Sequence, residues 1–215
     1  MKLIVITSEK SYDKEIDVIK QLFKAGMNTL HIRKPGFSRM KMKAFINDIP
    51  EKYHKKLVLH SHHSLSFTFK IKGIHFTEKH RKNVFLHNFY LRFYKIFKTE
   101  LQFSASYHSI KEVEKLPANK YKYVFLSPVF QSISKDNKKK DMNLSRIQDA
   151  LRETKAKVIA LGGIESDKLV RCQNVGFVGI AVLGNIWQSP DPIGTFTHLY
   201  ELCKKARYQS LALED

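Results

Sequence analysis

The sequence predicts a (β/α)8 barrel, in which eight parallel strands form a closed sheet and each strand is followed by a helix. Short apolar runs alternate with amphipathic helical segments along almost the whole chain of 215 residues. The segment 158–187 shows the unit most clearly, with a strand at 158–161, two glycines, a helix and a second strand at 177–183. Both apolar runs are continuous, which is typical of parallel strands buried on both faces. Eight strands favour closure, because a closed sheet leaves no exposed edge.

Local signals place each element along the chain. Gly26 ends the first helix, and Pro35 and Gly36 break the second strand. Ser38 and Ser109 stand where the helices after the second and fifth strands need N-caps. The expected strands are 2–7, 28–33, 57–59, 73–76, 102–106, 123–126, 158–161 and 177–183. The expected helices are 12–25, 38–48, 64–70, one within 88–98, 109–116, 144–154, one through 169–175, and 192–206.

Length and composition favour one domain, with residues 1–207 forming the barrel and residues 208–215 a C-terminal tail. An open, doubly wound sheet is the rival architecture. No G-x-G-x-x-G motif follows the first strand, which argues against the dinucleotide-binding form of that sheet. The sequence has no apolar run of about 18 residues and no signal-peptide pattern. We therefore expect a cytoplasmic protein without a membrane span.

The chain is strongly basic, with a formal net charge of +18 and a sequence pI near 9.8. Such a charge favours anionic partners. The lysines and arginines are scattered through almost every predicted helix, however, and the nearest approach to a cluster is 135–140. We therefore expect neither nucleic-acid nor membrane binding, and interpret the charge as solvated helix faces around an anion-attracting barrel mouth.

The chemistry of a (β/α)8 barrel lies at the carboxyl ends of its strands. Here these ends are rich in hydroxyl groups and cationic side chains and poor in carboxylates. Gly162-Gly163 and Gly184 follow strands seven and eight, where backbone N–H groups beside helix N-termini can hold a phosphate. Arg33 and Lys135 add charge-assisted hydrogen bonds. A phosphorylated substrate fits this mouth.

Histidines are frequent at the same ends. No carboxylate or cysteine completes a convincing metal-binding set with them. We therefore expect no resident metal, and solvated or hydrogen-bonded imidazoles at the rim of the barrel. The histidines concerned are His31, His60, His62, His63 and His75.

Six short motifs occur in order on the predicted strand ends. They are H-I-R-K at 31–34, G-I-H-F at 73–76, S-A-S-Y-H-S at 104–109, S-P-V-F-Q-S-I-S-K at 127–135, A-L-G-G-I at 160–164 and G-I-A-V-L-G-N-I at 179–186. With these motifs the chain resembles the thiamine-phosphate synthase and TenI-type thiazole tautomerase family over essentially its whole length. The resemblance implies a (β/α)8 barrel that works on thiazole phosphate in thiamine biosynthesis. The synthase joins aminopyrimidine diphosphate to thiazole phosphate and releases diphosphate, with Mg²⁺ bridging the leaving group.

The resemblance also implies catalytic residues. Arg33 matches the arginine that holds the diphosphate, and Ser106 matches a serine of the pyrimidine site. Ser132, Ser134 and Lys135 match a T-x-T-K segment, whose hydroxyls hold thiazole phosphate and whose lysine reaches the diphosphate.

Further residues are implied to bind substrate. Gly163 and the pair Leu183-Gly184 match the family's phosphate site, in agreement with the glycine argument above. His31 falls on the synthase's glutamine before the arginine, and His60 on the asparagine of an Asn-Asp pair. We place both histidines among the substrate-binding residues.

The departures from the family pattern concern charge and proton transfer. Ser61 replaces one Mg²⁺-binding aspartate, and the second falls near His80. Pro35 replaces a lysine, and Pro128 replaces the tautomerase's proposed proton-transferring histidine. Because these carboxylates are missing, we expect Mg²⁺ to bind only together with a substrate diphosphate.

Three hypotheses follow. The first is a divergent thiamine-phosphate synthase, in which the basic barrel mouth offsets the diphosphate charge that Mg²⁺ usually offsets. The second is a thiazole phosphate tautomerase that uses His31 or His108 as its proton carrier. The third is a non-catalytic binder of phosphorylated thiamine intermediates. All three have small phosphorylated ligands as partners, and a homo-oligomer is compatible with each.

Overall fold

Eight parallel strands close into a barrel, because each strand pairs with the next and β8 pairs with β1. The computed structural model describes residues 1–10, 12–131 and 142–211. The predicted barrel is confirmed, and the pairing of β8 with β1 excludes the open sheet. The strands are β1 (Lys2–Ile6), β2 (Leu30–Ile32), β3 (Leu57–Leu59), β4 (Gly73–Phe76), β5 (Gln102–Tyr107), β6 (Tyr123–Leu126), β7 (Val158–Leu161) and β8 (Gly179–Val182).

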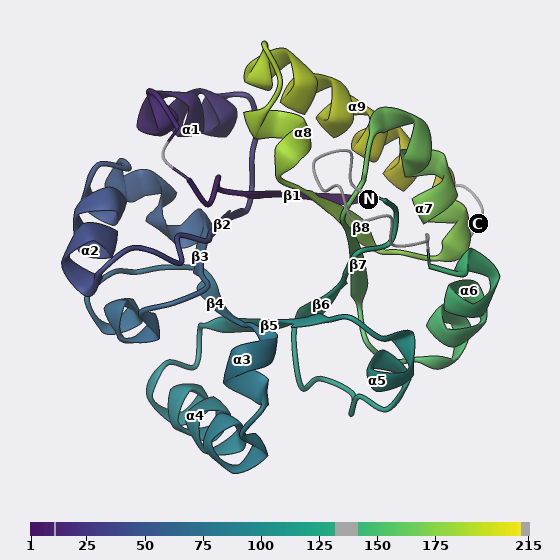
Figure 1. Ribbon diagram of the computed structural model, residues 1–215, viewed down its shortest axis with the longest axis horizontal. Helices are drawn as coiled ribbons and strands as arrows, with labels where there is room; N and C mark the ends of the chain where they lie inside the picture. The colour runs from purple at the N-terminus through teal and green to yellow at the C-terminus, as the bar shows by residue number, and fades with distance from the viewer. Residues whose placement is uncertain (11, 132–141, 212–215) are drawn as a thin grey trace.

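The helices surround the ring of strands (Figure 1). Ser38 caps α2 as predicted, since its hydroxyl accepts a hydrogen bond from the Lys41 N–H at 3.2 Å. The α-helices are α1 (Glu15–Lys24), α2 (Arg39–Asn47), α3 (Glu78–Arg81), α4 (Val84–Phe97), α5 (Ile110–Glu114), α6 (Leu144–Glu153), α7 (Leu169–Val175), α8 (Gly184–Trp187) and α9 (Pro192–Leu211). Short 3-10 helices are η1 (Glu51–Lys56), η2 (His63–Phe67) and η3 (Ser166–Lys168).

The largest difference from the predicted elements follows β4. Two helices, α3 and α4, lie between β4 and β5, where a single helix within 88–98 was expected. Thr77 begins α3 with a capping box, and the Asn83 side chain begins α4 by accepting the Leu86 N–H at 3.0 Å. The C-terminal helix α9 also continues to Leu211, beyond its expected end at Ala206. No helix within the described ranges is both long and apolar enough to cross a membrane.

An apolar layer between the strands and the helices forms the main core. It includes Ile19 and Leu22 of α1 and Met42 and Ile46 of α2, all fully buried. Burial of each such side chain stabilises the fold by about 1.5–3 kcal/mol. The amphipathic helices are therefore held against the barrel by the faces that the sequence pattern predicted.

A second layer fills the inside of the barrel, where alternate residues of each strand point. Its apolar part comes from β6, β7, β8 and β1, and consists of Ile4, Ile6, Tyr123, Phe125, Ile159 and Ala181. Strands β2, β4 and β5 contribute the buried polar side chains of His31, His75 and Ser104 instead. The interior is thus divided into an apolar half and an imidazole-rich half, and the second half holds the candidate site.

Candidate functional site

Three buried histidines from neighbouring strands form the centre of the site. His31 and His75 are fully buried within β2 and β4, and His60, directly after β3, is only 6 % exposed. The expectation that these imidazoles lie at the rim is wrong, because they occupy the inward-pointing positions of their strands. They are hydrogen-bonded, as expected: Nδ1 of His31 lies 2.8 Å from Nε2 of His60.

The next two strands of the barrel, β5 and β6, complete the network. The Tyr123 hydroxyl of β6 lies 2.7 Å from Nε2 of His31. His75 contacts two hydroxyls of β5, with Nδ1 at 2.9 Å from Ser104 Oγ and Nε2 at 2.7 Å from Ser106 Oγ. The structure therefore brings three predicted site residues, His31, His60 and Ser106, into one cluster. Sequence reasoning missed the Tyr123 and Ser104 members, which alternation along β5 and β6 could have indicated.

Burial keeps these groups uncharged. It lowers the pKa of His31 to about 3, with a smaller contribution from Lys72. Burial first, and neighbouring imidazoles second, hold the pKa values of His60 and His75 well below 6.5. Burial also raises the pKa of Tyr123. At neutral pH the network is therefore neutral, and each imidazole has one donor and one acceptor nitrogen.

The chain from Tyr123 through His31 to His60 has an open end. His60 Nδ1 is buried and has no hydrogen-bond partner among the residues that the structure describes. A buried polar atom without a hydrogen-bond partner destabilises the folded protein. A ligand that hydrogen-bonds to His60 Nδ1 would remove this penalty. Because every link in the chain can both donate and accept, a proton taken up at one end can be released at the other.

The same three histidines also meet the distance requirement of a metal site. Each offers a ring nitrogen, and these atoms lie within 4.8 Å of one another. The rings of His60 and His75, however, stack face to face, with centroids 4.1 Å apart and an interplanar angle of 18°. Imidazole lone pairs lie in the ring plane, so two stacked rings cannot both direct them at one ion. As arranged, the cluster is a hydrogen-bonded network, and metal binding requires at least one ring to turn.

Arg33 lies at the carboxyl end of β2, as predicted. Its backbone N–H donates to Thr7 Oγ1 at 2.9 Å, and the Thr7 hydroxyl donates back to the Arg33 carbonyl at 3.3 Å. These two bonds fix the Arg33 backbone beside the end of β1. The guanidinium forms an ion pair with Glu9, and both side chains are partly exposed. Glu9 is a mouth carboxylate that the sequence motifs did not indicate.

The neighbouring Lys34 does not belong to the cationic mouth. Its side chain is 1 % exposed, and its ammonium donates to Glu15 of α1 at 2.6 Å. The rings of Phe37 and Phe45 lie 5.6 and 5.4 Å from the same nitrogen. The mouth is therefore less basic than the sequence pattern suggested, and Lys34 joins the β2 loop to α1.

Two glycine turns follow the adjacent strands β7 and β8, at the same end of the barrel as Arg33. Gly163 has a positive φ of 62°, and an added Cβ would lie 2.1 Å from the Gln131 carbonyl oxygen. Only glycine fits there. Leu183 and Gly184 begin α8, and Asn185 donates its side-chain N–H to the Ile164 carbonyl at 3.0 Å. That bond joins the two loops.

Three predicted residues lie outside the described part of the chain. They are Ser132, Ser134 and Lys135, and their assigned roles remain predictions.

Comparisons with known proteins show which family the chain belongs to. The family model described as thiamine monophosphate synthase matches residues 3–186. The chain belongs to the thiamine monophosphate synthase family. It is 23 % identical over 202 residues to a thiamine-phosphate synthase of Dictyoglomus turgidum, covering 91 % of this chain and 87 % of that protein. Among solved structures, a thiamine phosphate pyrophosphorylase of Bacteroides thetaiotaomicron is similar, with 29 % identity, a TM-score of 0.74, and coverage of 95 % and 98 %.

A further solved structure supports the fold alone. The thiamine phosphate pyrophosphorylase of Pyrococcus furiosus shares 17 % identity, with a TM-score of 0.75 and coverage of 95 % of this chain and 96 % of that one. The identities are low throughout, so the chain is a divergent member of the thiamine monophosphate synthase family.

The family's magnesium site does not fit the residues present here. By the resemblance, Ser61 replaces one of its aspartates and the other falls near His80, whose Nδ1 accepts the Thr77 N–H at 3.2 Å in a capping box. Between the end of β3 and the start of α4, residues 60–83, Glu78 alone carries a carboxylate, and its Oε2 lies 3.8 Å from Nε2 of His108. Mg²⁺ prefers several oxygen ligands, including carboxylates. This segment does not supply them.

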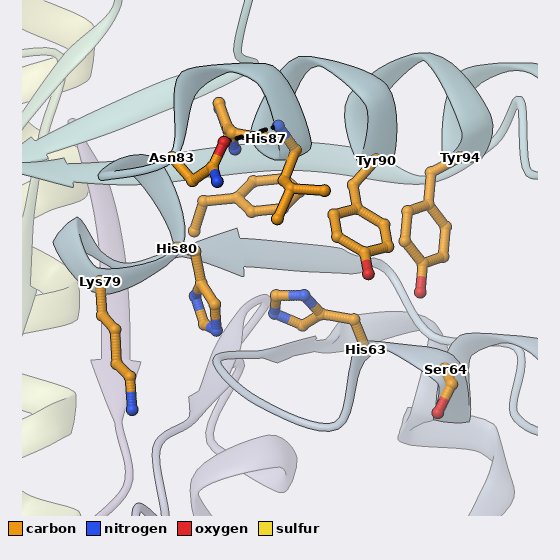
Figure 2. Close-up of a pocket in the computed structure, with 10 residues that line it drawn as sticks. His63, Ser64, Lys79, His80, Asn83, His87, Tyr90 and Tyr94 are labelled. Atoms are coloured by element: carbon orange, nitrogen blue, oxygen red, sulfur yellow. Dashed lines mark hydrogen bonds between the residues drawn. The ribbon is translucent and has the colours of Figure 1, made fainter.

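A pocket of about 440 Å³ lies beside this region, between α4 and the segments after β3 and β4. Figure 2 shows Tyr90 and Tyr94 pointing from α4 toward the segment that carries His63 and Ser64, with His80 facing His63. This pocket could not be predicted from the sequence, because it depends on where α4 packs. Its lining is His63, Ser64, Phe76, Lys79, His80, Asn83, Leu86, His87, Tyr90 and Tyr94.

Proposed function

We propose that this protein is a divergent thiamine-phosphate synthase, which joins aminopyrimidine diphosphate to thiazole phosphate and releases diphosphate. One observation carries the proposal: Arg33 and the two glycine turns around Gly163 and Gly184 lie at one end of a barrel whose interior offers a neutral polar network. Family membership and the names of the relatives support the same reaction.

Each part of the substrates has a proposed place. The backbone at Gly163, Leu183 and Gly184 holds the phosphate of thiazole phosphate, since glycine leaves N–H groups accessible. Arg33 binds the diphosphate by charge-assisted hydrogen bonds, in competition with Glu9.

The segment after β6 supplies the remaining phosphate contacts in this proposal. The hydroxyls of Ser132 and Ser134 hold thiazole phosphate, and Lys135 reaches the diphosphate. Their alternation in the sequence lets both hydroxyls face one ligand in an extended segment.

The pyrimidine enters above the imidazole network. Ser106, His31 and His60 provide donors and acceptors without charge, which suits a neutral heteroaromatic ring, and the open Nδ1 of His60 gains a partner. During the reaction, negative charge develops on the leaving diphosphate. Catalysis therefore depends mainly on the positive groups arranged around it before the reaction.

We further propose that the protein has no Mg²⁺ site of its own. An Mg²⁺ ion enters bound to the substrate diphosphate, because the strand ends supply a serine and an imidazole in place of aspartates. The remaining partners are small phosphorylated molecules of the cytoplasm, and nucleic acid is not among them.

A second candidate function is supported by the chain of Tyr123, His31 and His60. A thiazole phosphate tautomerase must move a proton, and this chain of neutral groups can carry one. The family's tautomerase histidine is Pro128 here, so His31 would act from inside the barrel rather than from the loop after β6. Proton exchange into thiazole phosphate, measured without the pyrimidine substrate, separates the two activities.

Calorimetry tests the proposed binding sites. We expect thiazole phosphate and aminopyrimidine diphosphate each to bind with one-to-one stoichiometry, and Mg²⁺ to strengthen only the second. Gly163→Ala should abolish thiazole phosphate binding, whereas Gly36→Ala, whose added Cβ meets open space, should not. Tight binding of Mg²⁺ to the protein alone would refute the magnesium proposal, and no binding of either substrate by folded protein would refute the function.

A further inference from the structure

Helix α4 has two apolar faces. One faces the barrel and buries His87, Leu91 and Tyr94. The other is turned to solvent, and its side chains are exposed by between 37 % for Phe93 and 79 % for Phe85. We call this second set the α4 outer face, which consists of Phe85, Leu86, Phe89, Tyr90, Phe93, Ile96 and Phe97.

The α4 outer face is continuous. At 3.6 residues per turn, its members occupy an uninterrupted arc of about 140° around the helix. The polar residues Asn88, Arg92 and Lys95 lie together beside that arc, and the helix has no carboxylate. The charged side chains can therefore reach solvent from the edge while the apolar arc is covered.

The apolar area that the α4 outer face exposes is as large as that of a protein–protein interface. Phe67 of η2, also exposed, extends the face, because its ring lies 6.1 Å from that of Phe93. At about 150–200 Å² for a fully exposed large apolar side chain, the set exposes roughly 700–900 Å². A typical monomer exposes no apolar patch beyond about 300–600 Å², and a stable complex buries about 800 Å² per partner.

We propose that the α4 outer face is the interface of a symmetric homodimer, in which α4 packs against α4 of a second copy. Figure 1 shows α4 at the outer edge of the molecule, with α3 nearer to the strands, so a second copy can approach it. With a two-fold axis across α4, the α4 outer face of one copy packs against the same face of the second copy, so both faces are buried. With 14 residues, α4 offers a contact about 21 Å long.

A second copy explains this face better than an anionic lipid surface. Helices that lie on such membranes carry a strongly basic polar face. On α4 only Arg92 and Lys95 are basic, and the other lysines and arginines are spread over the whole protein. The net charge of +18 opposes association of two copies, and salt screens that repulsion. The dimer is therefore expected to strengthen with salt, whereas binding to anionic lipid weakens.

Dimerisation affects the region around the site. Leu86 and Tyr90 belong both to the α4 outer face and to the pocket, so a second copy covers one side of that pocket. The preceding α3 contacts the barrel mouth, where Arg81 donates to the Ser106 carbonyl at 2.6 Å and lies 3.7 Å from the Tyr107 ring centroid. The proposed interface thus helps to hold α3 and α4 in place, and Arg81 of α3 contacts the backbone of Ser106. It does not depend on the proposed activity.

Sedimentation velocity on the full chain tests the proposal. We expect a particle of twice the 25.1 kDa protomer mass at micromolar concentration, with a dissociation constant that falls as salt is raised. The variant Phe85→Ser/Phe89→Ser/Ile96→Ser should weaken the dimer by at least about a hundredfold. The control Met40→Ser/Val170→Ser replaces exposed apolar side chains on α2 and α7, and should remain a dimer.

Circular dichroism must first show that both variants are folded. A wild-type monomer at all salt concentrations overturns the proposal, and so does a dimer that the α4 variant leaves intact. A third result also overturns it: a monomer that binds phosphatidylglycerol vesicles and loses this binding in the α4 variant, which would assign the face to lipid.

Discussion

The Tyr123 hydroxyl lies 2.7 Å from Nε2 of His31, which joins β6 to β2 across the inside of the barrel. His31 continues this chain to His60 of the next strand. Two neutral imidazoles thereby stand where hydrocarbon fills the other half of the barrel interior, and the ring of Tyr123 belongs to that apolar half while its hydroxyl joins the imidazole network. Buried imidazoles couple folding to pH, and Nδ1 of His60, directly after β3, is left without a hydrogen-bond partner among the described residues.

Stability should fall as pH drops below about 6.5. Burial holds the pKa of His31 at about 3, and those of His60 and His75 well below 6.5, in the folded protein. The unfolded chain has ordinary histidine pKa values and binds more protons in this range, so acid favours unfolding. Each histidine contributes about 1.4 kcal/mol per pH unit below its unfolded pKa.

Urea unfolding between pH 7 and about pH 5 measures this slope. His31→Gln should reduce the slope by about one proton. Identical slopes in wild type and His31→Gln would show that His31 is protonated in the folded state.

The buried ion pair of Lys34 and Glu15 should be important for stability. Lys34→Met leaves the Glu15 carboxylate buried without its partner, and we expect a loss of about 3–5 kcal/mol in the free energy of unfolding. Lys20→Met removes an exposed pair with Asp17 on the same helix and should cost less than about 1 kcal/mol. Lys34→Met/Glu15→Leu should regain much of the loss. Equal effects of Lys34→Met and Lys20→Met would contradict the buried-pair interpretation.

Glu9 should compete with a diphosphate for Arg33. Glu9→Gln frees the guanidinium and removes a negative charge from the mouth, so a diphosphate ligand should bind several-fold more tightly. Arg33→Gln should weaken the same ligand by about tenfold to a hundredfold. Titration calorimetry at constant ionic strength measures both. A weaker complex with Glu9→Gln would indicate that Glu9 itself helps to bind the ligand.

Much of the fold could be predicted from the sequence. The bounds of β3, β4, β6 and β7 agree with their predicted ranges, because each is a short apolar run between clear breaks. Helix α3 and the first turn of α4 were missed, since their start depends on the side-chain caps of Thr77 and Asn83 inside a segment that reads as a basic loop.

The site was predictable only in part. The sequence located Arg33, His31, His60, Ser106 and the glycine turns at the strand ends. It did not show that the histidines point inward, because a strand buried on both faces gives no alternation of hydrophobicity. Pairings such as Arg33 with Glu9, and His31 with Tyr123, connect residues far apart in the sequence and required the closed barrel.

Lys135 should matter more than its lysine neighbours. If it contacts the diphosphate through a desolvated charge-assisted bond, Lys135→Ala should weaken a diphosphate ligand by about 1.5–3 kcal/mol more than Lys139→Ala does. Both lysines carry the same charge in the same segment, so Lys139→Ala controls for diffuse attraction. Equal, small effects of the two substitutions at low salt would show that the segment offers only diffuse charge.

The most direct measurement is turnover of the two proposed substrates. Purified protein is incubated with thiazole phosphate, aminopyrimidine diphosphate and Mg²⁺, and thiamine phosphate and released diphosphate are quantified together. We expect equal amounts of both products, formed over many turnovers by the wild type and reduced at least about tenfold by Arg33→Gln. Folded wild-type protein that binds both substrates but forms no thiamine phosphate would contradict the synthase assignment.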